Sequence, residues 1–157
     1  MNYRVQVYDS FSGISPLDRA VVEQFIHRFG EVADSGEITE ALDYAVKNKP
    51  SFGGFIIAAW QGMEVQACVV VNKTGMGSFN ACFVLAYAAV HPAVDHPEAV
   101  LQELIGRARQ HAKGDIAFHL PPGNPGISLF KRLGFEERYV ELRLGAHPAS
   151  KRHPLSP

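Results

Sequence analysis

The spacing of apolar residues switches between alternation and helical periodicity along the chain. Residues 3–8 alternate valine with polar residues, which predicts a first strand. Residues 15–30 begin with a serine cap and a proline, repeat apolar residues at helical spacing and end at a glycine, so they predict a helix. Residues 38–46 predict a second helix, which stops before a proline.

Three strands are expected next, over residues 54–60, 65–71 and 79–90. The third is apolar on both of its alternating faces, which is typical of a strand covered on both sides. Residues 100–112 then repeat apolar positions at helical spacing up to Gly114, and residues 115–119 predict a short strand.

The last ordered part of the chain reads as a capped helix followed by a strand. Asn124 is a good N-cap, and Pro125 suits the first helical position. Gly134 supplies a left-handed C-cap, and residues 139–144 alternate like a strand. Residues 145–157 hold three prolines and no apolar periodicity, so we expect a mobile tail after a single domain over 1–144.

Composition narrows the class of protein. With 157 residues, 46% hydrophobic, 20% charged and a net charge of −1, the chain predicts a soluble globular protein without a nucleic-acid partner. No apolar run approaches the length of a membrane span, and the N-terminus lacks a signal-peptide core, so a cytoplasmic location is expected.

The spacing of the cysteines and histidines matches no redox or metal-binding motif. Cys68 and Cys82 are expected to be reduced core thiols. A hairpin around residues 75–77 would allow them to lie close together, so a redox pair or a reactive thiol stays open. The seven histidines show no metal-binding spacing, so no metal is expected.

Residues 124–135 resemble the last conserved segment of the GNAT family of acyl-CoA-dependent N-acetyltransferases, in which a helix ending in Leu-Gly-Phe precedes the final strands. The order of predicted elements over residues 3–144 is also similar to that family. The resemblance implies an α+β fold, an α/β/α sandwich with a mixed, mostly antiparallel central sheet and helices on both faces. Another α+β domain remains an alternative.

The resemblance also implies where an acetyl-CoA or another acyl-CoA would bind. The residues concerned are Ala88, Ala89, Val90, Ala99, Val100, Leu101, Asn124, Phe130 and Lys131. The first three end the central strand, whose exposed backbone pairs with pantetheine in the family. The next three offer N–H groups to the pyrophosphate at a helix N-terminus. The last three belong to the C-terminal helical segment.

The segment expected to cradle the pyrophosphate departs from the family pattern. The family has an Arg/Gln-x-x-Gly-x-Gly/Ala loop, whereas residues 93–98 contain no glycine. Pro97 removes one donor, and Asp95 and Glu98 bring negative charge. The same residues are good helix-capping residues, so the segment predicts a helix start with weakened anion binding.

Catalytic candidates are few. The tyrosine that commonly serves as the acid in the family corresponds to Phe130, which cannot donate a proton. Tyr87 on the central strand and His119 at the end of the next strand are the candidates, and each also has a structural interpretation. The leading hypothesis is direct acyl transfer to a small-molecule or peptide amine. The alternative is a catalytically silent GNAT-fold binding or interaction module, and a homodimer is left open.

Overall fold

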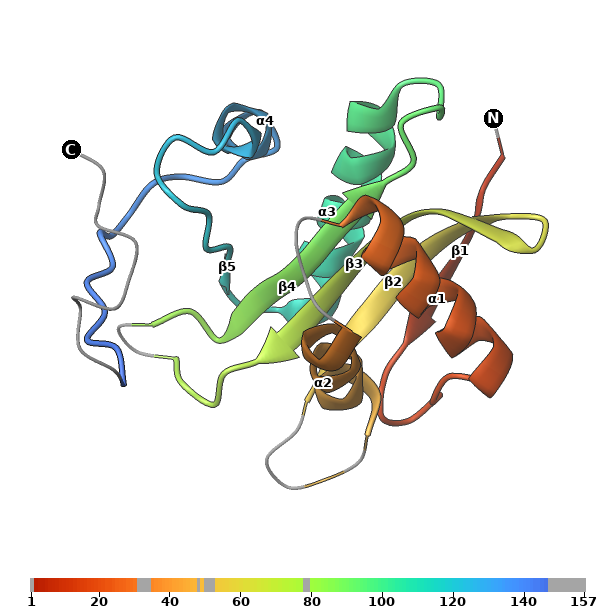
Figure 1. The fold of residues 1–157 in the computed structure, drawn as a ribbon, viewed down its shortest axis with the longest axis horizontal. Helices are drawn as coiled ribbons and strands as arrows, with labels where there is room; N and C mark the ends of the chain where they lie inside the picture. The colour runs from red at the N-terminus through yellow and green to blue at the C-terminus, as the bar shows by residue number, and fades with distance from the viewer. Residues whose placement is uncertain (1, 31–34, 48, 50–52, 78–79, 147–157) are drawn as a thin grey trace.

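The computed structural model describes residues 2–30, 35–47, 49, 53–77 and 80–146. A five-stranded sheet, whose spatial order follows the chain order, forms its centre (Figure 1). The strands are β1 (Arg4–Tyr8), β2 (Gly54–Gln61), β3 (Glu64–Lys73), β4 (Phe83–Val90) and β5 (Ile116–Ala117). The first four run antiparallel to their neighbours, and β5 is parallel to β4.

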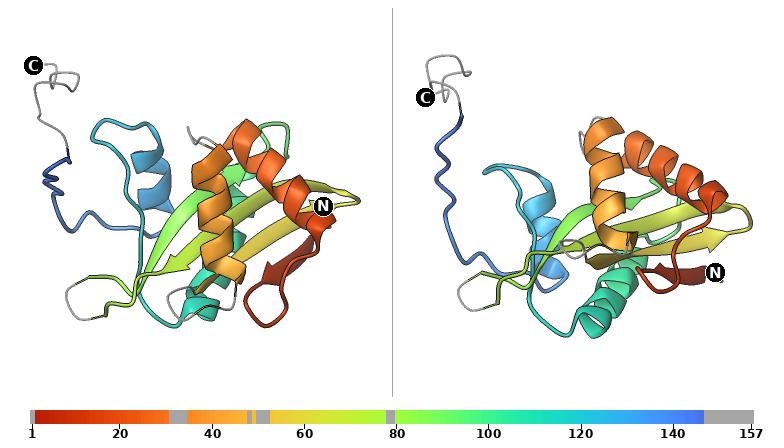
Figure 2. Two further views of the ribbon diagram at one scale, coloured as in Figure 1. Left: turned by 60° about the horizontal axis from the view of Figure 1, so that its bottom comes forward. Right: turned by 90° about the horizontal axis from the view of Figure 1, so that it is seen from below.

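Helices cover both faces of this sheet. The helices are α1 (Pro16–Phe29), α2 (Ser35–Val46), α3 (Pro97–Ala112) and α4 (Gly126–Arg132). Figure 2 shows α1 and α2 together on one face and α3 on the other. The α+β sandwich expected from the sequence is therefore confirmed.

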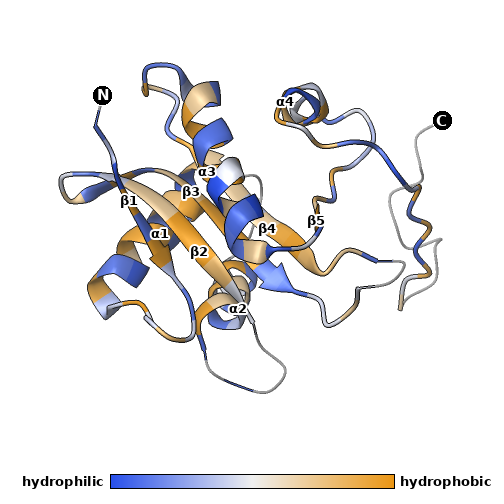
Figure 3. Ribbon diagram, turned by 180° about the vertical axis from the view of Figure 1, so that it is seen from behind, coloured by the Kyte–Doolittle hydropathy of each residue, from blue (hydrophilic) through white to orange (hydrophobic). Residues whose placement is uncertain are grey.

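Alternate residues of the central strands build two separate cores. On β2, Ile56 and Ala58 face α1 and α2, whereas Phe55 and Ile57 face α3 and α4. All four are at most 2% exposed, as expected for a strand with both faces covered. Figure 3 shows the apolar strands lying beneath α3. Each large side chain buried in this way contributes about 1.5–3 kcal/mol.

The helix starts and stops follow the capping signals of the sequence. The Ser15 hydroxyl accepts the Asp18 N–H at 3.1 Å and so caps α1, which ends before Gly30. The four apolar positions predicted for α2 are all buried: Ile38, Leu42, Ala45 and Val46. Among the described residues, no helix is both long and apolar enough to cross a membrane.

Several element boundaries differ from the predictions. β4 begins at Phe83, and residue 79 lies outside the described residues. β5 has only two residues in place of the predicted 115–119. Lys113, in a left-handed conformation with φ 55°, is the C-cap of α3 ahead of Gly114. The described residues 139–144 do not form the predicted strand, and the predicted tail lies outside the described residues from 147 onward.

The two cysteines are not brought together. Cys68 lies opposite Ala89 on β4, whereas Cys82 precedes Phe83, which lies opposite Lys73. Cys82 lies beside Thr74, because its carbonyl accepts the Thr74 N–H, so the two cysteines are six residue steps apart along the strands, about 20 Å. Both thiols are free, and complete burial raises the pKa of Cys68 to about 12.

Candidate functional site

The outer edge of β4 is open along most of its length. β5 pairs only with Phe83 and Val84, and beyond Ala117 the chain leaves β4 (Figure 1). In the described part of the chain, no strand pairs with residues 85–90 on that side. An extended ligand would therefore meet no competing strand of the described part on this side of residues 85–90.

β4 also carries a β-bulge directly before Tyr87. Val70 lies opposite Tyr87 and Val71 opposite Leu85, so Ala86 is an extra residue in the ladder. Tyr87 is partly buried and packs against the core beneath α1 and α2. The bulge thus precedes the candidate catalytic tyrosine directly and helps to set which face of the sheet it occupies.

The predicted cofactor residues of β4 lie along the open edge. Ala89 points into the core beneath α1 and α2 and is 3% exposed. Ala88 and Val90 are partly buried against the core on the other face. The three side chains are therefore engaged in packing, and it is their backbone that a ligand would meet.

The start of α3 has fewer free N–H donors than its sequence predicts. His96 is the N-cap, in a left-handed conformation with φ 55° and without a side-chain cap bond. Its carbonyl accepts the N–H groups of Ala99 at 3.0 Å and Val100 at 3.3 Å. Pro97 has no N–H, and the Leu101 side chain is buried. The assumption that the Ala99 and Val100 N–H groups are free is corrected.

A side chain from α4 neutralises the acid at this helix start. Arg132 donates from Nε to Glu98 Oε1 at 3.0 Å and from a terminal nitrogen to Oε2 at 3.2 Å. These bonds lower the pKa of Glu98 and raise that of Arg132. The pair joins the ends of α3 and α4 through a bidentate contact at the surface.

The predicted residues of the C-terminal segment mainly support α4. The Asn124 side-chain oxygen accepts the Gly126 N–H at 2.7 Å and so satisfies a donor at the helix start, while Pro125 takes the N-cap position itself. Phe130 is 8% exposed and packs edge-on against Phe118 and Phe135, with ring centroids 4.7 and 5.6 Å away. Lys131 is exposed, and its ammonium lies 2.9 Å from Glu137.

His119 lies on the segment that leaves β4. Phe118 and Leu120 on either side pack into the core near α4, while His119 is exposed. The strand ladder ends at Ala117, so strand pairing does not hold His119 opposite Tyr87. The two catalytic candidates thus stand on segments that diverge.

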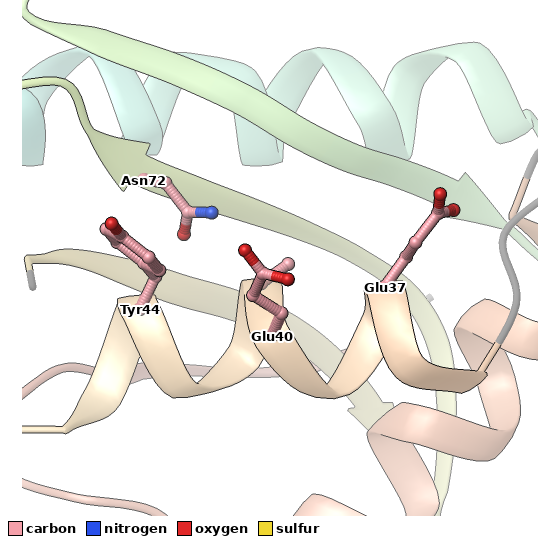
Figure 4. A pocket seen from close by; sticks show the side chains of 5 residues that line it. Glu37, Glu40, Tyr44 and Asn72 are labelled. Atoms are coloured by element: carbon pink, nitrogen blue, oxygen red, sulfur yellow. The ribbon is translucent and has the colours of Figure 1, made fainter. Parts of the chain in front are cut away.

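A pocket of about 450 Å³ lies between α2 and β3, on the same face of the sheet as Tyr87. It is lined by Glu37, Glu40, Ala41, Tyr44 and Asn72. In Figure 4 the side chains of Glu40 and Tyr44 rise from the helix toward Asn72 on the strand. The Asn72 side-chain oxygen is buried and has no hydrogen-bond partner among the described residues.

The chemistry of this pocket favours a cation. The two carboxylates and the Asn72 amide oxygen are acceptors, and N–H donors with positive charge are complementary to them. The sequence pattern does not single out these residues as a site. The spacing of Glu37, Glu40 and Tyr44 places them on one helix face, but no sequence signal linked that face to Asn72.

Comparison with solved structures identifies the fold of this chain. No family model and no curated protein matches the sequence. Among solved structures, the aminoglycoside antibiotic 6'-N-acetyltransferase AAC(6')-IG from Acinetobacter haemolyticus is 13% identical, with TM-score 0.66 over 92% of this chain and 99% of that one. The GNAT family acetyltransferase SP0256 from Streptococcus pneumoniae TIGR4 is 12% identical, with TM-score 0.64 over 93% and 100%.

A third structure contains a cofactor-like ligand. AAC(6')-Iy, solved with the bisubstrate analogue CoA-S-monomethyl-acetylneamine, is 15% identical, with TM-score 0.60 over 93% of this chain and 100% of that one. At these identities the likeness concerns the fold. The chain therefore has the GNAT fold, as its order of elements and its Leu-Gly-Phe segment had indicated.

Proposed function

We propose that this protein is a GNAT-type N-acyltransferase that moves an acyl group from an acyl-CoA to an amine. The observation that carries the proposal is the open edge of β4. A pantetheine arm contains amide groups and can pair with an exposed strand as another strand does. The bisubstrate analogue bound to AAC(6')-Iy supports a CoA ligand in this fold.

The chain is better suited to the pantetheine arm of an acyl-CoA than to its pyrophosphate. The backbone of residues 88–90 suits the pantetheine arm. The α3 start suits the pyrophosphate poorly, because two of its N–H groups are bonded to His96 and Glu98 adds a negative charge. Arg132 and Lys131 are the nearby cations that would hold the phosphates, after exchanging their present carboxylate partners.

Two side chains are proposed for proton transfer. An acyl thioester supplies an activated carbonyl, and the acceptor amine must lose a proton before or during attack. His119 is exposed, and the free nitrogen of a neutral imidazole is a proton acceptor. Tyr87 carries a hydroxyl on β4 that would donate a proton to the leaving sulfur.

The acceptor is proposed to be a small-molecule or peptide amine that binds beside α2. The pocket of Glu37, Glu40 and Asn72 lies on the face that Tyr87 occupies and presents acceptors. Amines are protonated near neutral pH and satisfy such acceptors. The neighbouring structures named for aminoglycosides, which are amines, support this choice.

A second candidate function is a silent GNAT-fold module that binds a ligand or partner without acyl transfer. The start of α3 favours it, because a glycine-free loop, a proline and the Glu98–Arg132 pair replace a phosphate cradle. This candidate keeps the fold and the open edge of β4 but loses the cofactor.

A thermal-shift experiment separates the two candidates. Purified protein is heated with acetyl-CoA, with pantetheine alone and with 3',5'-ADP alone. A ligand at about 100 times its Kd adds roughly 2.7 kcal/mol and raises Tm by a few degrees. Shifts with acetyl-CoA and pantetheine support the acyltransferase and its β4 site. No shift with any of the three at millimolar concentration supports the silent module.

A further inference from the structure

A second hollow lies at the opposite end of α3 from the Glu98–Arg132 pair. Its volume is about 400 Å³. Four of its five lining residues come from the end of α3 and its C-cap, and the fifth belongs to β1: Arg107, Gln110, His111, Lys113 and Val7. The four polar side chains can all donate from N–H groups, and no carboxylate is among the described residues that line the hollow. The hollow is therefore complementary to an anion.

The donors of this hollow gather on one side of the α3 end. Residues 107–113 contain two arginines and a lysine but no acidic residue, although the whole chain has a net charge of −1. A cation in the last turn stabilises a helix on whichever side of the helix it lies. Arg107, Gln110 and His111 are spaced i, i+3 and i+4, so they share one side. The helix dipole explains cations at this end of α3 but not their gathering around one hollow.

Two neighbours fix the His111 ring at the hollow. The ring packs edge-on against Phe55, with ring centroids 4.5 Å apart, and its Nε2 atom lies 3.7 Å from Asp9 Oδ2. The Asp9 carboxylate accepts the backbone N–H groups of Ser12 and Phe11, each at 2.9 Å, and these bonds lower its pKa. Asp9 is not one of the lining residues. An imidazole held in this way loses little freedom when it contacts a ligand.

The other donors can turn toward a ligand at little cost. Arg107 lies 3.2 Å from Glu103 one turn earlier, and both side chains are at least half exposed, so this ion pair contributes little. The side chains of Gln110 and Lys113 have no hydrogen-bond or ion-pair partner among the described residues. A ligand in the hollow therefore displaces no strong contact.

We propose that this hollow binds a phosphate dianion, either free or as the end group of a phosphomonoester. Phosphate offers several acceptor oxygens and up to two negative charges, which match the permanent cations Arg107 and Lys113 and two further donors. A carboxylate has one charge and two oxygens, so it would leave donors unmatched. The volume of about 400 Å³ exceeds that of a phosphate ion, and Val7 supplies an apolar wall for the carbon atoms of an ester.

A titration followed by nuclear magnetic resonance tests the site. Backbone amide signals of isotopically labelled protein would be recorded at constant ionic strength with inorganic phosphate, with glycerol 2-phosphate and with acetate. We expect saturable shifts at residues 107–113 and at Val7 with both phosphate compounds, and far smaller shifts with acetate. Tighter binding of glycerol 2-phosphate identifies an ester as the ligand, whereas equal affinity shows that the phosphate group alone is recognised.

Charge-removing variants locate the bound phosphate. The C-terminal dipole of α3 opposes an anion, so affinity depends on the side-chain cations. Arg107→Gln and Lys113→Gln should each raise the Kd for phosphate about fivefold. Arg109→Gln is the matched control, because it removes the same charge from the same end of the helix. The Arg109 guanidinium reaches Gly134 instead, 3.1 Å from the position of a Cβ there, so this variant should keep the wild-type Kd.

Three results would overturn the proposal. The first is the absence of saturable shifts with either phosphate compound up to tens of millimolar. The second is equal weakening by Arg109→Gln and Lys113→Gln, which would show a diffuse attraction to the basic helix end. The third is tighter phosphate binding by Glu98→Gln, which would place the phosphate at the start of α3, in the acyl-CoA site proposed above. Amide signals that are unchanged away from each substitution confirm that the variants fold.

Discussion

Arg132, in the last turn of α4, binds the Glu98 carboxylate in the first turn of α3 through two hydrogen bonds of 3.0 and 3.2 Å. Thirty-four residues separate the partners in the chain. In the acyl-CoA site proposed above, the phosphates would lie beside this pair, where they need a cation and no competing anion. Breaking this ion pair and measuring the affinity for CoA therefore tests the acyl-CoA proposal directly.

Substitution of Glu98 is expected to strengthen CoA binding. Glu98→Gln removes a negative charge beside the α3 start and releases Arg132 for a phosphate, so we expect Kd for CoA to fall about tenfold, as measured by calorimetry. Glu103→Gln is the matched control, because Glu103 lies on the same helix and pairs with Arg107. Equal Kd values for wild type and Glu98→Gln would show that phosphates do not bind there.

The acidic pocket is expected to set the affinity for the amine. Glu37→Gln and Glu40→Gln each remove an exposed charged acceptor, which is worth up to about 1 kcal/mol, so KM for a diamine is expected to rise about two- to fivefold with kcat little changed. Glu64→Gln, an exposed carboxylate at the start of β3, serves as the control. If KM stays at its wild-type value in both pocket variants, the acceptor binds elsewhere.

The proton-transfer residues are expected to affect kcat rather than cofactor binding. His119→Ala and Tyr87→Phe should each lower kcat about 10²–10⁴-fold while the Kd for CoA is unchanged, because general acid and base contributions have this size. His27→Ala, an exposed histidine on α1, is the control. A variant with wild-type turnover removes its residue from the mechanism.

Tyr8 is expected to make the protein lose stability in alkali. The Tyr8 hydroxyl donates to Asp18 Oδ2 at 2.8 Å, and burial together with this bond raises its pKa from 10.0 to about 12. The unfolded chain therefore loses this proton first as pH rises. The stabilising contribution is complete below pH 10 and falls by about 1.4 kcal/mol per unit between pH 10 and 12.

Urea unfolding of wild type and Tyr8→Phe between pH 8 and 12 measures this contribution. The phenylalanine variant lacks the titrating hydroxyl, so the difference in unfolding free energy between the two proteins should shrink as pH rises. A difference that is constant with pH would contradict the raised pKa.

Gly54, the first residue of β2, is expected to tolerate substitution poorly. Its φ is +134°, and a Cβ there would lie 2.0 Å from the Val71 carbonyl oxygen. Gly54→Ala should cost at least about 3 kcal/mol of unfolding free energy. Gly62 has φ +62° with nothing near a Cβ, so Gly62→Ala should cost only about 1 kcal/mol. Similar losses in the two variants would contradict the close approach at Gly54.

The sequence predicted the elements whose causes are local. The Ser15 cap, the stop at Gly30 and the Asn124 bond at the start of α4 depend on residues within one turn of each other, and the structure contains all three. The apolar residues of β2 predicted a strand, and the structure buries both faces. Alternation and capping express interactions over a few residues, so they are readable from one sequence.

Contacts between segments that are distant in the chain could not be predicted from these local patterns. The pairing of Glu98 with Arg132, and of the α2 acids with Asn72, depends on how elements pack and not on spacing. The strand predicted at residues 139–144 has the right alternation, but a strand also needs a neighbour, which the sequence of one chain does not specify. The candidate catalytic residues Tyr87 and His119 remain predictions.

The strands lie in the sheet in the same order as in the chain, and this order affects how the protein is expected to fold. β2, β3 and β4 form a meander, and only Gly62 and Met63 join the first two of these strands. Such pairs close small loops, whereas β5 reaches β4 only after the α3 crossover. The meander is therefore expected to form early and the crossover to dock late. The open edge of β4 would then be the last border of the molecule to be assembled and the first to loosen when it unfolds.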